Sequence, residues 1–476
     1  MAPPQRPNQP ANSASGRPSP SSPPQRSAGG PAVEKPVAAR IPIKKIFTAE
    51  SSNYFLLLGT TIFLVIFGLV MVLSSSSVSS YTADEGFFGS FLRQGLFALL
   101  GVPLMLVASR APARFWKRMA FPGIILGALL QVLVFVPGIG WAYGGNQNWI
   151  RIGNFSAQPS EFVKVAIIVW VAWVLATKQD QLTEWRQVLM PIAPVAGGAI
   201  VLVLVGNDLG TASIMLLIVF TCMFFAGVRL KFLAVGFAAI AFAAVAFAGV
   251  SSSRSDRIDV WLNGCTEVDY QGSCWQIEHA YWALAGGGVF GVGLGNSVAK
   301  RGWLPHADSD YVFAIIGEEL GLIGAVVVLL LFVTLAIAFI RIIRSTSDSF
   351  VRIGTAGVMV WVVGQAFVNI AVVLGVLPVL GVPLPLISTG GSALIATLLA
   401  IGVVLSFARE EHARAKGAPR SQQPGPADAV SAAAPAPTKR RRQVAAPEKA
   451  PAPPTPAQSA AERSRMLAAN RAKGRR

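Results

Sequence analysis

The hydrophobic pattern divides the middle of the chain into ten long apolar runs separated by polar segments. A helix rises about 1.5 Å per residue, so about 20 mostly apolar residues cross the hydrocarbon core of a bilayer. Each run is close to this length or longer, which predicts an all-α polytopic membrane protein with ten transmembrane helices. The runs lie near residues 54–73, 92–108, 119–137, 159–176, 188–205, 210–227, 231–250, 312–340, 353–374 and 390–408.

Basic residues in the loops predict the orientation of these helices, because cytoplasmic loops carry an excess of Lys and Arg. Alternate loops are rich in basic residues if both termini are cytoplasmic. The loops on the predicted inner side contain Arg110, Arg114, Lys117, Arg118, Lys178, Arg186, Arg229, Lys231, Arg341, Arg344 and Arg352. The loops on the outer side contain Arg93, Arg151, Arg254, Arg257, Lys300 and Arg301, and the last four lie in a long loop, residues 251–311, where the rule has little weight.

The composition agrees with a membrane protein, since the 476 residues are 53% hydrophobic and only 13% charged. The formal charge of +17 comes mainly from the two tails. Residues 1–50 hold seven Lys or Arg and two acidic residues, and residues 409–476 hold fifteen and five. The tails thus carry +5 and +10, which leaves about +2 for the rest of the chain. The basic charge therefore does not indicate a nucleic-acid-binding domain.

Both tails are rich in Pro, Ala, Ser and Arg and have few large apolar residues, so we expect them to be disordered. The predicted organisation is a disordered tail at 1–50, a membrane domain at 51–408 and a disordered tail at 409–476. The N-terminus lacks the apolar run and cleavage site of a secretory signal, so the first span should direct insertion. The run KRRR at 439–442 suits either binding of acidic peptides or anionic lipid, or a solubilising linker.

An ionisable residue inside a bilayer costs several kcal/mol unless it is paired or faces water, and so indicates function. Lys164 lies in the fourth predicted span, and Glu161 precedes it by three residues on the same helical face. An ion pair between them is geometrically available. The alternative is that Lys164 snorkels to the outer surface. Gln158 and Ser160 add to this polar cluster and favour a cavity.

Asp208 and two cysteines also allow two interpretations each. Asp208 precedes the sixth predicted span, where it can cap the helix or contribute to a site. Cys265 and Cys274 lie in the long outer loop and can form a disulfide or remain free thiols. Only three His are present in the chain, and no metal-ligand spacing of Cys and His occurs.

Carboxylates and irregular backbone are predicted to gather at the outer membrane surface. Residues 302–321 read GWLPHADSDYVFAIIGEELG, and the apolar run after them, Leu322 to Ile340, is long enough to span by itself. Asp308, Asp310, Glu318 and Glu319 should therefore lie at or outside the outer interface. The later segment GVLPVLGVPLPLISTGG contains too many Pro and Gly for a continuous helix. It is either a simple turn or a lining of a wet cavity with an anion site at the next helix.

Six segments in order resemble the SEDS family (shape, elongation, division and sporulation proteins). They are GLVMVLSSSSV, QPSEFVK, NDLGTA, GGGVFGVGLGNSVAKRGWLP, DYVFAIIGEELG and GVPLPLISTGGS, and they cover roughly residues 54–408. The resemblance implies a peptidoglycan glycosyltransferase that polymerises lipid II and works with a class B penicillin-binding protein. GLVMVLSSSSV and the long tails favour the division branch of the family over the elongation branch.

The resemblance also implies roles for individual residues. Asp310 matches the essential acidic residue of the family and would act as a general base. Lys164, Arg151, Lys300 and Arg301 are candidates to bind the pyrophosphate, and a divalent cation, Mg²⁺ or Mn²⁺, is expected from the family alone. The remaining candidates for substrate binding are Glu161, Gln158, Asp208, Gln276, Glu319, Pro383, Ser388, Gly390 and Gly391.

The chain departs from the family pattern at several positions near these residues. Asn148 stands where an Arg is common, and Leu380 and Thr389 replace Lys and Tyr. His306 and Asp308 occupy positions where the family commonly has Glu and His, and Ser309 replaces Thr. Two other classes of function stay open at this point. A lipid II flippase would need its essential charges near the membrane midplane, and a scaffold for other division proteins would use the basic tails.

Overall fold

The computed structural model describes residues 51–417, apart from 83, 85, 144, 154, 249–251 and 266–272. The predicted tail at 1–50, residues 418–476 of the predicted tail at 409–476, and the run at 439–442 lie outside the described residues, whereas residues 409–417 continue the last helix. Eight helical segments are long and apolar enough to cross a membrane. They are α2 (Ser52–Thr82), α3 (Gly89–Ala108), α5 (Pro159–Thr177), α6 to α7 (Trp185–Val205), α8 (Leu209–Ala226), α12 (Val312–Ser345), α13 to α14 (Ser349–Val373) and α15 (Gly391–Gly417).

Two further helices occupy the other predicted spans. They are α4 (Ala113–Leu133) and α9 (Leu230–Ala248). Every predicted run therefore corresponds to helix, and the multi-pass helical membrane class is confirmed. The count of ten spans stays a prediction, because only eight segments meet the criteria of length and apolarity among the described residues.

The all-α prediction was wrong in one loop, where three short strands form an antiparallel sheet. The strands are β1 (Gly140–Tyr143), β2 (Asn146–Ile152) and β3 (Phe155–Ala157), in the order β1-β2-β3. Trp141 pairs with Trp149, and Arg151 pairs with Ser156. The strand β2 reads NQNWIRI, in which apolar residues are few and do not form a long run, so a search for long apolar runs does not detect it.

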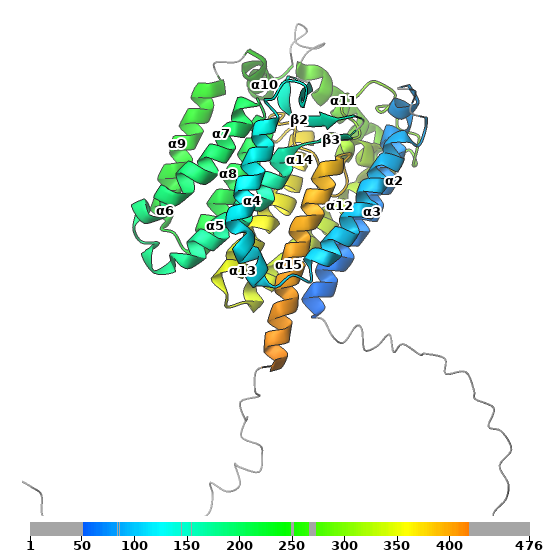
Figure 1. The fold of residues 1–476 in the computed structure, drawn as a ribbon. Helices are drawn as coiled ribbons and strands as arrows, with labels where there is room; N and C mark the ends of the chain where they lie inside the picture. The colour runs from blue at the N-terminus through cyan, green and yellow to red at the C-terminus, as the bar shows by residue number, and fades with distance from the viewer. Residues whose placement is uncertain are drawn as a thin grey trace, which may run out of the picture. The chain divides into compact units, whose positions relative to one another are not determined.

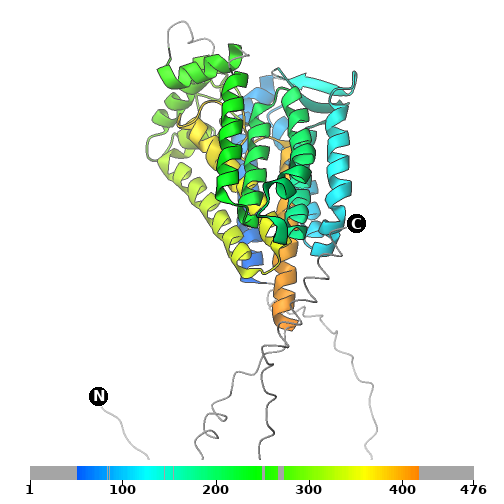
Figure 2. The same ribbon diagram turned by 90° about the vertical axis from the view of Figure 1, so that its left-hand side faces the viewer.

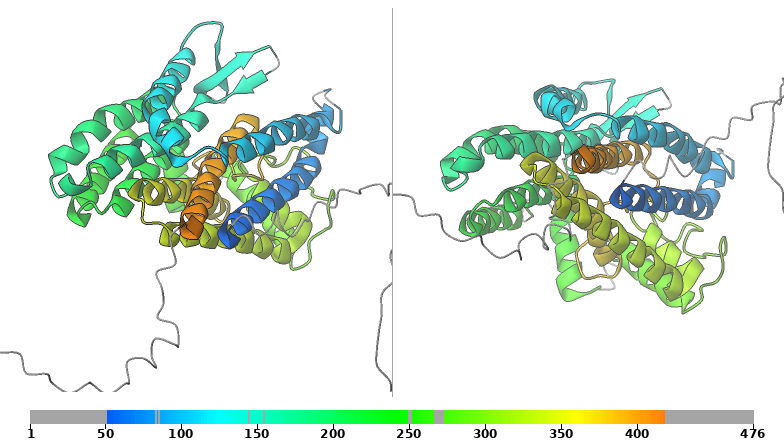
Figure 3. Two further views of the ribbon diagram at one scale, coloured as in Figure 1. Left: turned by 60° about the horizontal axis from the view of Figure 1, so that its bottom comes forward. Right: turned by 90° about the horizontal axis from the view of Figure 1, so that it is seen from below.

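The helix termini define two ends of the membrane domain. The first residues of α2 and the last of α15 lie at one end, and the sheet, α10 (Ser252–Asn263) and α11 (Ser273–Gly287) lie at the opposite end, which we call the hairpin end (Figures 1 and 2). Both termini of the membrane domain are thus on one side. The central position belongs to α15, which contacts α2, α3, α4, α5, α12 and α13 (Figure 3).

Two spans contain a π-helical segment. Residues Ala193–Gly197 (η2) join α6 (Trp185–Ile192) to α7 (Gly198–Val205), and residues Val360–Gly364 (η3) join α13 (Ser349–Met359) to α14 (Gln365–Val373). Such segments are rare in proteins overall, and where they occur they often lie at functional sites. The second one directly precedes Gln365 and Asn369, which are both buried in the membrane domain.

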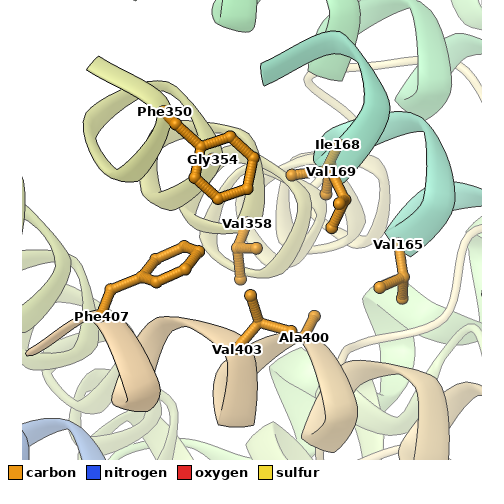
Figure 4. Close-up of a pocket in the computed structure, with 9 residues that line it drawn as sticks. All are labelled: Val165, Ile168, Val169, Phe350, Gly354, Val358, Ala400, Val403 and Phe407. Atoms are coloured by element: carbon orange, nitrogen blue, oxygen red, sulfur yellow. The ribbon is translucent and has the colours of Figure 1, made fainter. Parts of the chain in front are cut away.

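A small apolar cavity lies in the core between α5, α13 and α15. Figure 4 shows side chains of these three helices around it, among them Val165, Val358 and Val403, with Phe350 and Phe407 at one side. The lining is entirely apolar, so it offers no group that would orient a polar substrate. The candidate functional site lies instead at the hairpin end, around Asp310.

Candidate active site

The segment that carries Asp310 is held by its backbone. The carbonyls of the three successive residues 308–310 all accept hydrogen bonds from a later part of the chain. Thr389 donates to the first from its N–H at 2.9 Å and its hydroxyl at 3.0 Å. Ser388 donates to the second at 2.6 Å, and the amide of Asn369 donates to the carbonyl of Asp310 at 2.7 Å. The backbone of Asp310 is thus fixed while its carboxylate stays free of these bonds.

The carboxylate of Asp310 is half-buried, and no hydrogen bond reaches it from the described part of the chain. The pKa of Asp310 is raised from 3.8 to about 6, mainly by burial and also by the negative charges of Asp208 and Asp308. The positive charges of His306 and Arg257 act in the opposite direction. A carboxylate with such a pKa is ionised near neutral pH and is basic enough to accept a proton.

Asp208 serves as a helix cap and also faces this site. Its Oδ1 accepts the Thr211 N–H at 2.9 Å, so the capping interpretation is confirmed. Its Oδ2 accepts from the Gln158 amide at 2.9 Å. The charge of Asp208 acts on Asp310, which brings the start of α8 (Leu209–Ala226) into the same site. Asp208 therefore both caps α8 and lies near Asp310, so the two interpretations of this residue are compatible.

The Pro- and Gly-rich segment after α14 is irregular over residues 376–390, as predicted. Its carbonyls at Val382 and Pro383 accept bonds from Asn369 and Gln365, at 2.7 Å and 2.9 Å. Ser388 accepts the Leu384 N–H at 2.8 Å, which closes a tight loop. These side chains supply the backbone partners that a helix would supply itself, as irregular backbone at membrane depth requires.

Close backbone approach explains two glycines around this segment. A Cβ on Gly210 would lie 2.3 Å from the carbonyl oxygen of Leu380, and a Cβ on Gly68 would lie 2.4 Å from that of Leu386. Neither position can accept a side chain without displacing the loop. A Cβ on Gly381 would lie 3.7 Å from Oδ2 of Asp310, so the same loop also passes beside this carboxylate.

Positive φ angles at non-glycine residues are concentrated in the segments of this site. Asn207, His306 and Leu386 have φ of 66°, 57° and 67°. Each such residue stores backbone strain that the surrounding structure must hold. These residues lie beside Asp208, in the Asp310 loop and in the Pro- and Gly-rich segment, which are the three segments that meet here.

Glu161 and Lys164 form the ion pair that their spacing predicts, with 2.8 Å between Oε1 and Nζ. The side chain of Lys164 is only 1% exposed, so the snorkelling alternative was wrong. Its ammonium also donates to Gln365 at 3.3 Å and lies 4.7 Å from the centre of the Trp361 ring. Through Gln365, this cluster supports the carbonyl of Pro383. Its visible role is to position the loop, and its charge is already compensated.

A second buried ion pair joins the long loop to α12. Lys300 and Glu319 are 2.8 Å apart, with side chains 2% and 0% exposed. Lys300 also donates to the carbonyl of Ser74 at 3.0 Å, and Ser74 donates to Glu319. Glu318 accepts the hydroxyl of Ser297 and the N–H of Val298. Both glutamates thus lie in reach of the loop, as expected, and they lock it in place.

Several other residues predicted from the sequence make no described contact with the segment around Asp310. Arg151 is exposed on β2, with its guanidinium 5.2 Å from the Trp141 ring centre. Gln276 is half-buried on α11. Cys265 and Cys274 form a disulfide, with their Cα atoms 5.7 Å apart.

The predicted anion site before α15 has some of its donors occupied. The N–H of Gly390 donates to the side-chain oxygen of Gln94 at 3.3 Å, and the N–H of Thr389 donates to the carbonyl of Asp308. Ser392, after Gly391, accepts the N–H of Gln158 at 3.1 Å. These bonds tie the start of α15 to α3 and α5 and leave fewer groups for an anion.

The departures from the family pattern have local partners. Asn148 is fully buried, accepts from Gln131 at 2.7 Å and donates to the carbonyls of Val203 and Gly206. It thereby attaches the sheet to the turn that leads to Asp208. Thr389 holds the carbonyl of Asp308, as described above.

The sequence analysis missed Gln365 and Asn369. Both lie in an apolar span and are four residues apart, so they share a helical face. A polar pair of this spacing inside a span was the available signal. Gln94 was also missed, and it donates to the carbonyl of Ser388 at 3.1 Å.

The described residues contain no group of three or more His, Cys, Asp or Glu that would hold a metal ion. A closed protein cage for a cation is therefore not built from this part of the chain. Mg²⁺ often uses only one or two carboxylates together with the phosphates of a substrate.

Comparison with known proteins agrees with this arrangement. Residues 54–413 match the family model of the FtsW, RodA and SpoVE cell cycle proteins. The chain is 39% identical over 360 residues to a probable peptidoglycan glycosyltransferase FtsW of Mycobacterium tuberculosis, covering 76% of this chain and 68% of that protein. It is 36% identical over 363 residues to stage V sporulation protein E of Bacillus subtilis, covering 76% and 98%.

Two solved structures have a similar fold. One, described as showing the structural coordination of polymerization and crosslinking by a peptidoglycan synthase complex, gives a TM-score of 0.62 at 25% identity and covers 75% of this chain and 97% of that chain. The other, the rod shape determining protein RodA of Thermus thermophilus, gives 0.56 at 24% identity and covers 77% and 99%. The match to the family model extends over most of the chain, so the chain belongs to the FtsW/RodA/SpoVE family of cell cycle proteins, the SEDS family that its motifs resemble.

Proposed function

We propose that this chain is a septal peptidoglycan glycosyltransferase, which polymerises lipid II into β-1,4 glycan strands with Asp310 as general base. The observation that carries the proposal is the state of the Asp310 carboxylate. The carbonyls of residues 308–310 are held by three side chains, the pKa of the Asp310 carboxyl group is raised to about 6, and no described group hydrogen-bonds to this carboxylate. Relatives named as peptidoglycan glycosyltransferases support the reaction class.

The chemistry requires one base. The acceptor sugar 4-hydroxyl attacks the anomeric carbon of the donor, and Asp310 takes the hydroxyl proton as the new C–O bond forms. The bond from the anomeric carbon to the pyrophosphate oxygen breaks, and its electron pair leaves with the pyrophosphate. This leaving group needs no proton, so the paired acids of a glycosidase are not required. A single displacement inverts an α-linked donor into a β link.

The other residues of the site have supporting roles in this proposal. Glu161, Lys164 and Gln365 position the loop at Pro383, while Gln158 donates a hydrogen bond to Asp208, whose charge acts on Asp310. A Mg²⁺ or Mn²⁺ ion bound with the pyrophosphate would be held by Asp208 and Asp308 and would neutralise charge on the leaving group. The exposed Arg151 is available to approach a phosphate from the hairpin end.

We further propose that ten helices span the membrane, that both termini are cytoplasmic and that the hairpin end faces outward at the division septum. The positive loops support this orientation. A class B penicillin-binding protein would crosslink the strands beside this chain, in line with the synthase complex that has a similar fold. The basic tails would bind other division proteins or anionic lipid.

The test is glycan polymerisation from labelled lipid II by the purified full chain with its transpeptidase, comparing wild type and Asp310→Asn. Polymer that depends on Asp310 supports the proposal, and equal polymer from both proteins contradicts the role of Asp310. A liposome assay of lipid II movement distinguishes the flippase. If lipid II moves at normal rates and neither protein makes polymer, the proposed function is wrong and the chain is a transporter.

A further inference from the structure

The long loop contains an apolar stretch that is not a membrane span. Residues 281–299 read YWALAGGGVFGVGLGNSVA and contain no Asp, Glu, Lys, Arg or His. We call these residues the shelf. They include the end of α11 and the irregular segment after it. An aqueous loop has little reason to exclude charge over 19 residues, whereas a lipid-facing one does.

The shelf is bonded to α12 at a break in that helix. Gly321 has φ of 68° and ψ of −166°, so the regular bonds from residues 322 and 323 to the carbonyls of 318 and 319 are lost. All four groups find partners in residues 288–293. The N–H groups of Leu322 and Ile323 donate to the carbonyls of Gly288 and Val289, at 2.9 Å and 3.3 Å.

The two freed carbonyls are satisfied in the same way. The N–H groups of Val292 and Gly293 donate to the carbonyls of Glu318 and Glu319, both at 3.0 Å. A Cβ on Gly291 would lie 2.2 Å from the carbonyl oxygen of Glu319, so the approach requires glycine there. Complete pairing of this kind is required where no water is available to bond the backbone. The shelf therefore lies at the same level along the membrane normal as residues 318–323, and its backbone is paired as that position requires.

The outer surface of the shelf is strongly apolar. Phe290 is 82% exposed, and Val289, Leu294 and Val298 are each more than half exposed. This surface continues onto the exposed apolar face of α12, which includes Leu322 and Ile323. The continuity identifies the occupant, because the adjoining face of a spanning helix contacts lipid. Contiguous apolar surface of this kind marks a membrane or protein contact.

Aromatic side chains flank this surface. Trp282 and Trp303 are 53% and 51% exposed. Trp is enriched at the level of the lipid head groups, where its ring spans an apolar and a polar zone. Leu322 to Ile340 covers about 29 Å as a helix, enough for the hydrocarbon core, so Leu322 lies near its boundary.

We propose that the shelf inserts into the lipid leaflet at the hairpin end, with Phe290 in contact with acyl chains. The loop that would otherwise be placed in water is then a membrane-embedded part of the domain. It ends next to Lys300, which forms an ion pair with Glu319 on α12. Asp310 lies two residues before the start of α12. Insertion would therefore set the height of Asp310 relative to the lipid head groups. This inference is independent of the reaction proposed above.

The test places a nitroxide on Phe290→Cys in the full chain, reconstituted alone in lipid nanodiscs. Collision with oxygen reports lipid, and collision with a water-soluble nickel chelate reports water. Leu330→Cys on α12, where the residue is 58% exposed, is the lipid control, and Asn263→Cys on α10, also exposed, is the water control. Wild type measures background labelling from Cys222, which is buried, and from the disulfide pair.

We expect the oxygen-to-nickel ratio at position 290 to be several-fold higher than at 263 and lower than at 330, which lies about 12 Å deeper along α12 than Leu322. Val298→Cys provides a second position should the first variant fail to fold, and the same ratio is expected there. A ratio equal to that at 263 would place the shelf in water and overturn the proposal. Low collision with both reagents would also overturn it, because the surface would then be covered by protein, such as a second copy.

Discussion

Two groups of carboxylates lie at the hairpin end, and they differ in how completely they are bonded. Glu319 has a buried Lys300 at 2.8 Å and a serine hydroxyl, and Glu318 accepts from a serine hydroxyl and backbone N–H groups. Asp310 has a fixed backbone, a raised pKa and a carboxylate to which no described group hydrogen-bonds. All three are acidic residues beside the same membrane boundary.

The difference separates structure from chemistry. A buried charge is stable only when it is paired and hydrogen-bonded, so the glutamates hold the loop because their bonds are complete. A group that must exchange a proton with a substrate needs lone pairs that are not already hydrogen-bonded, and a pKa near the working pH. Asp310 meets both conditions because the surrounding residues bond its carbonyl and leave its carboxylate open.

The largest expected effect is the loss of activity in Asp310→Asn. The amide cannot accept the proton, and a general base contributes about 10² to 10⁴-fold, so polymerisation should fall by that factor. The melting temperature at pH 7 should not fall, because the substitution removes a carboxylate that burial disfavours. Initial rates with labelled lipid II and a thermal melt measure the two quantities.

Asp308→Asn is the matched control for this change. Asp308 lies in the same loop, and its carbonyl, rather than its carboxylate, accepts the hydrogen bonds from Thr389. We expect a smaller loss than in Asp310→Asn. An equal or larger loss that added Mg²⁺ does not restore would move the role of base from Asp310 to Asp308.

The next effect is on stability, through Glu319→Gln. This variant leaves the buried ammonium of Lys300 without its counter-charge, and breaking such a pair costs about 3 to 5 kcal/mol. The melting temperature of the purified protein should fall clearly. Adding Lys300→Met removes the unpaired charge and should recover part of the loss. If the double variant is as unstable as the single one, the ion pair is not the source of the effect.

A smaller effect on rate is expected from Asn369→Leu. The carbonyls of Asp310 and Val382 would each lose a bond of 2.7 Å, and the base would be less well placed. Misplacement of a reacting group by about 1 Å can cost as much as 10²-fold, so we expect about a tenfold fall in kcat with little change in KM. Thr334→Val, which removes an exposed hydroxyl bonded within α12, is the control. A rise in KM alone would indicate a role in binding.

The smallest effect is expected at the opposite end, in Asp348→Asn. Burial acts to raise the pKa of Asp348, but the hydrogen bond and charge of Lys117 and the backbone N–H groups of Phe350 and Val351 lower it overall. Lys117 is partly exposed, so the pair should contribute less than about 1 kcal/mol. Asn can still cap α13, so activity should be unchanged.

The pH dependence follows from the sign of this shift. The folded-state pKa is below the usual value, so the stabilisation by Asp348 is present at neutral pH and is lost as pH falls through the folded pKa. Melting temperatures of wild type and Asp348→Asn should converge at low pH. A difference that grows on acidification would contradict the assignment.

Much of the fold was predictable, because long apolar runs have one physical interpretation at bilayer thickness. The pair Glu161 and Lys164 was also predictable, since spacing of three on a helix brings them together. The sheet at 140–157 was not, because its strands are short and lack a clear alternation of apolar and polar residues. The break at Gly321 was not either, because its replacement bonds come from about 30 residues earlier, a distance that no local pattern encodes.

The site was predictable in its members more than in their roles. Asp310 and Asp208 were identified from the sequence, whereas Lys164 and Lys300 were named as candidates to bind the pyrophosphate. Both are buried and paired. Burial of a long side chain depends on which helix packs over it, and this tertiary information is missing from the sequence.

The central claim, that Asp310 is the ionising base, is tested most directly by the rate of polymerisation against pH. Its pKa is raised to about 6, and the ionised form is the active one, so the wild-type rate should rise with pH through about 6 and level off above it. The residual rate of Asp310→Asn should show no such rise. If the same rise persists in Asp310→Asn, another group carries the ionisation and the account is wrong.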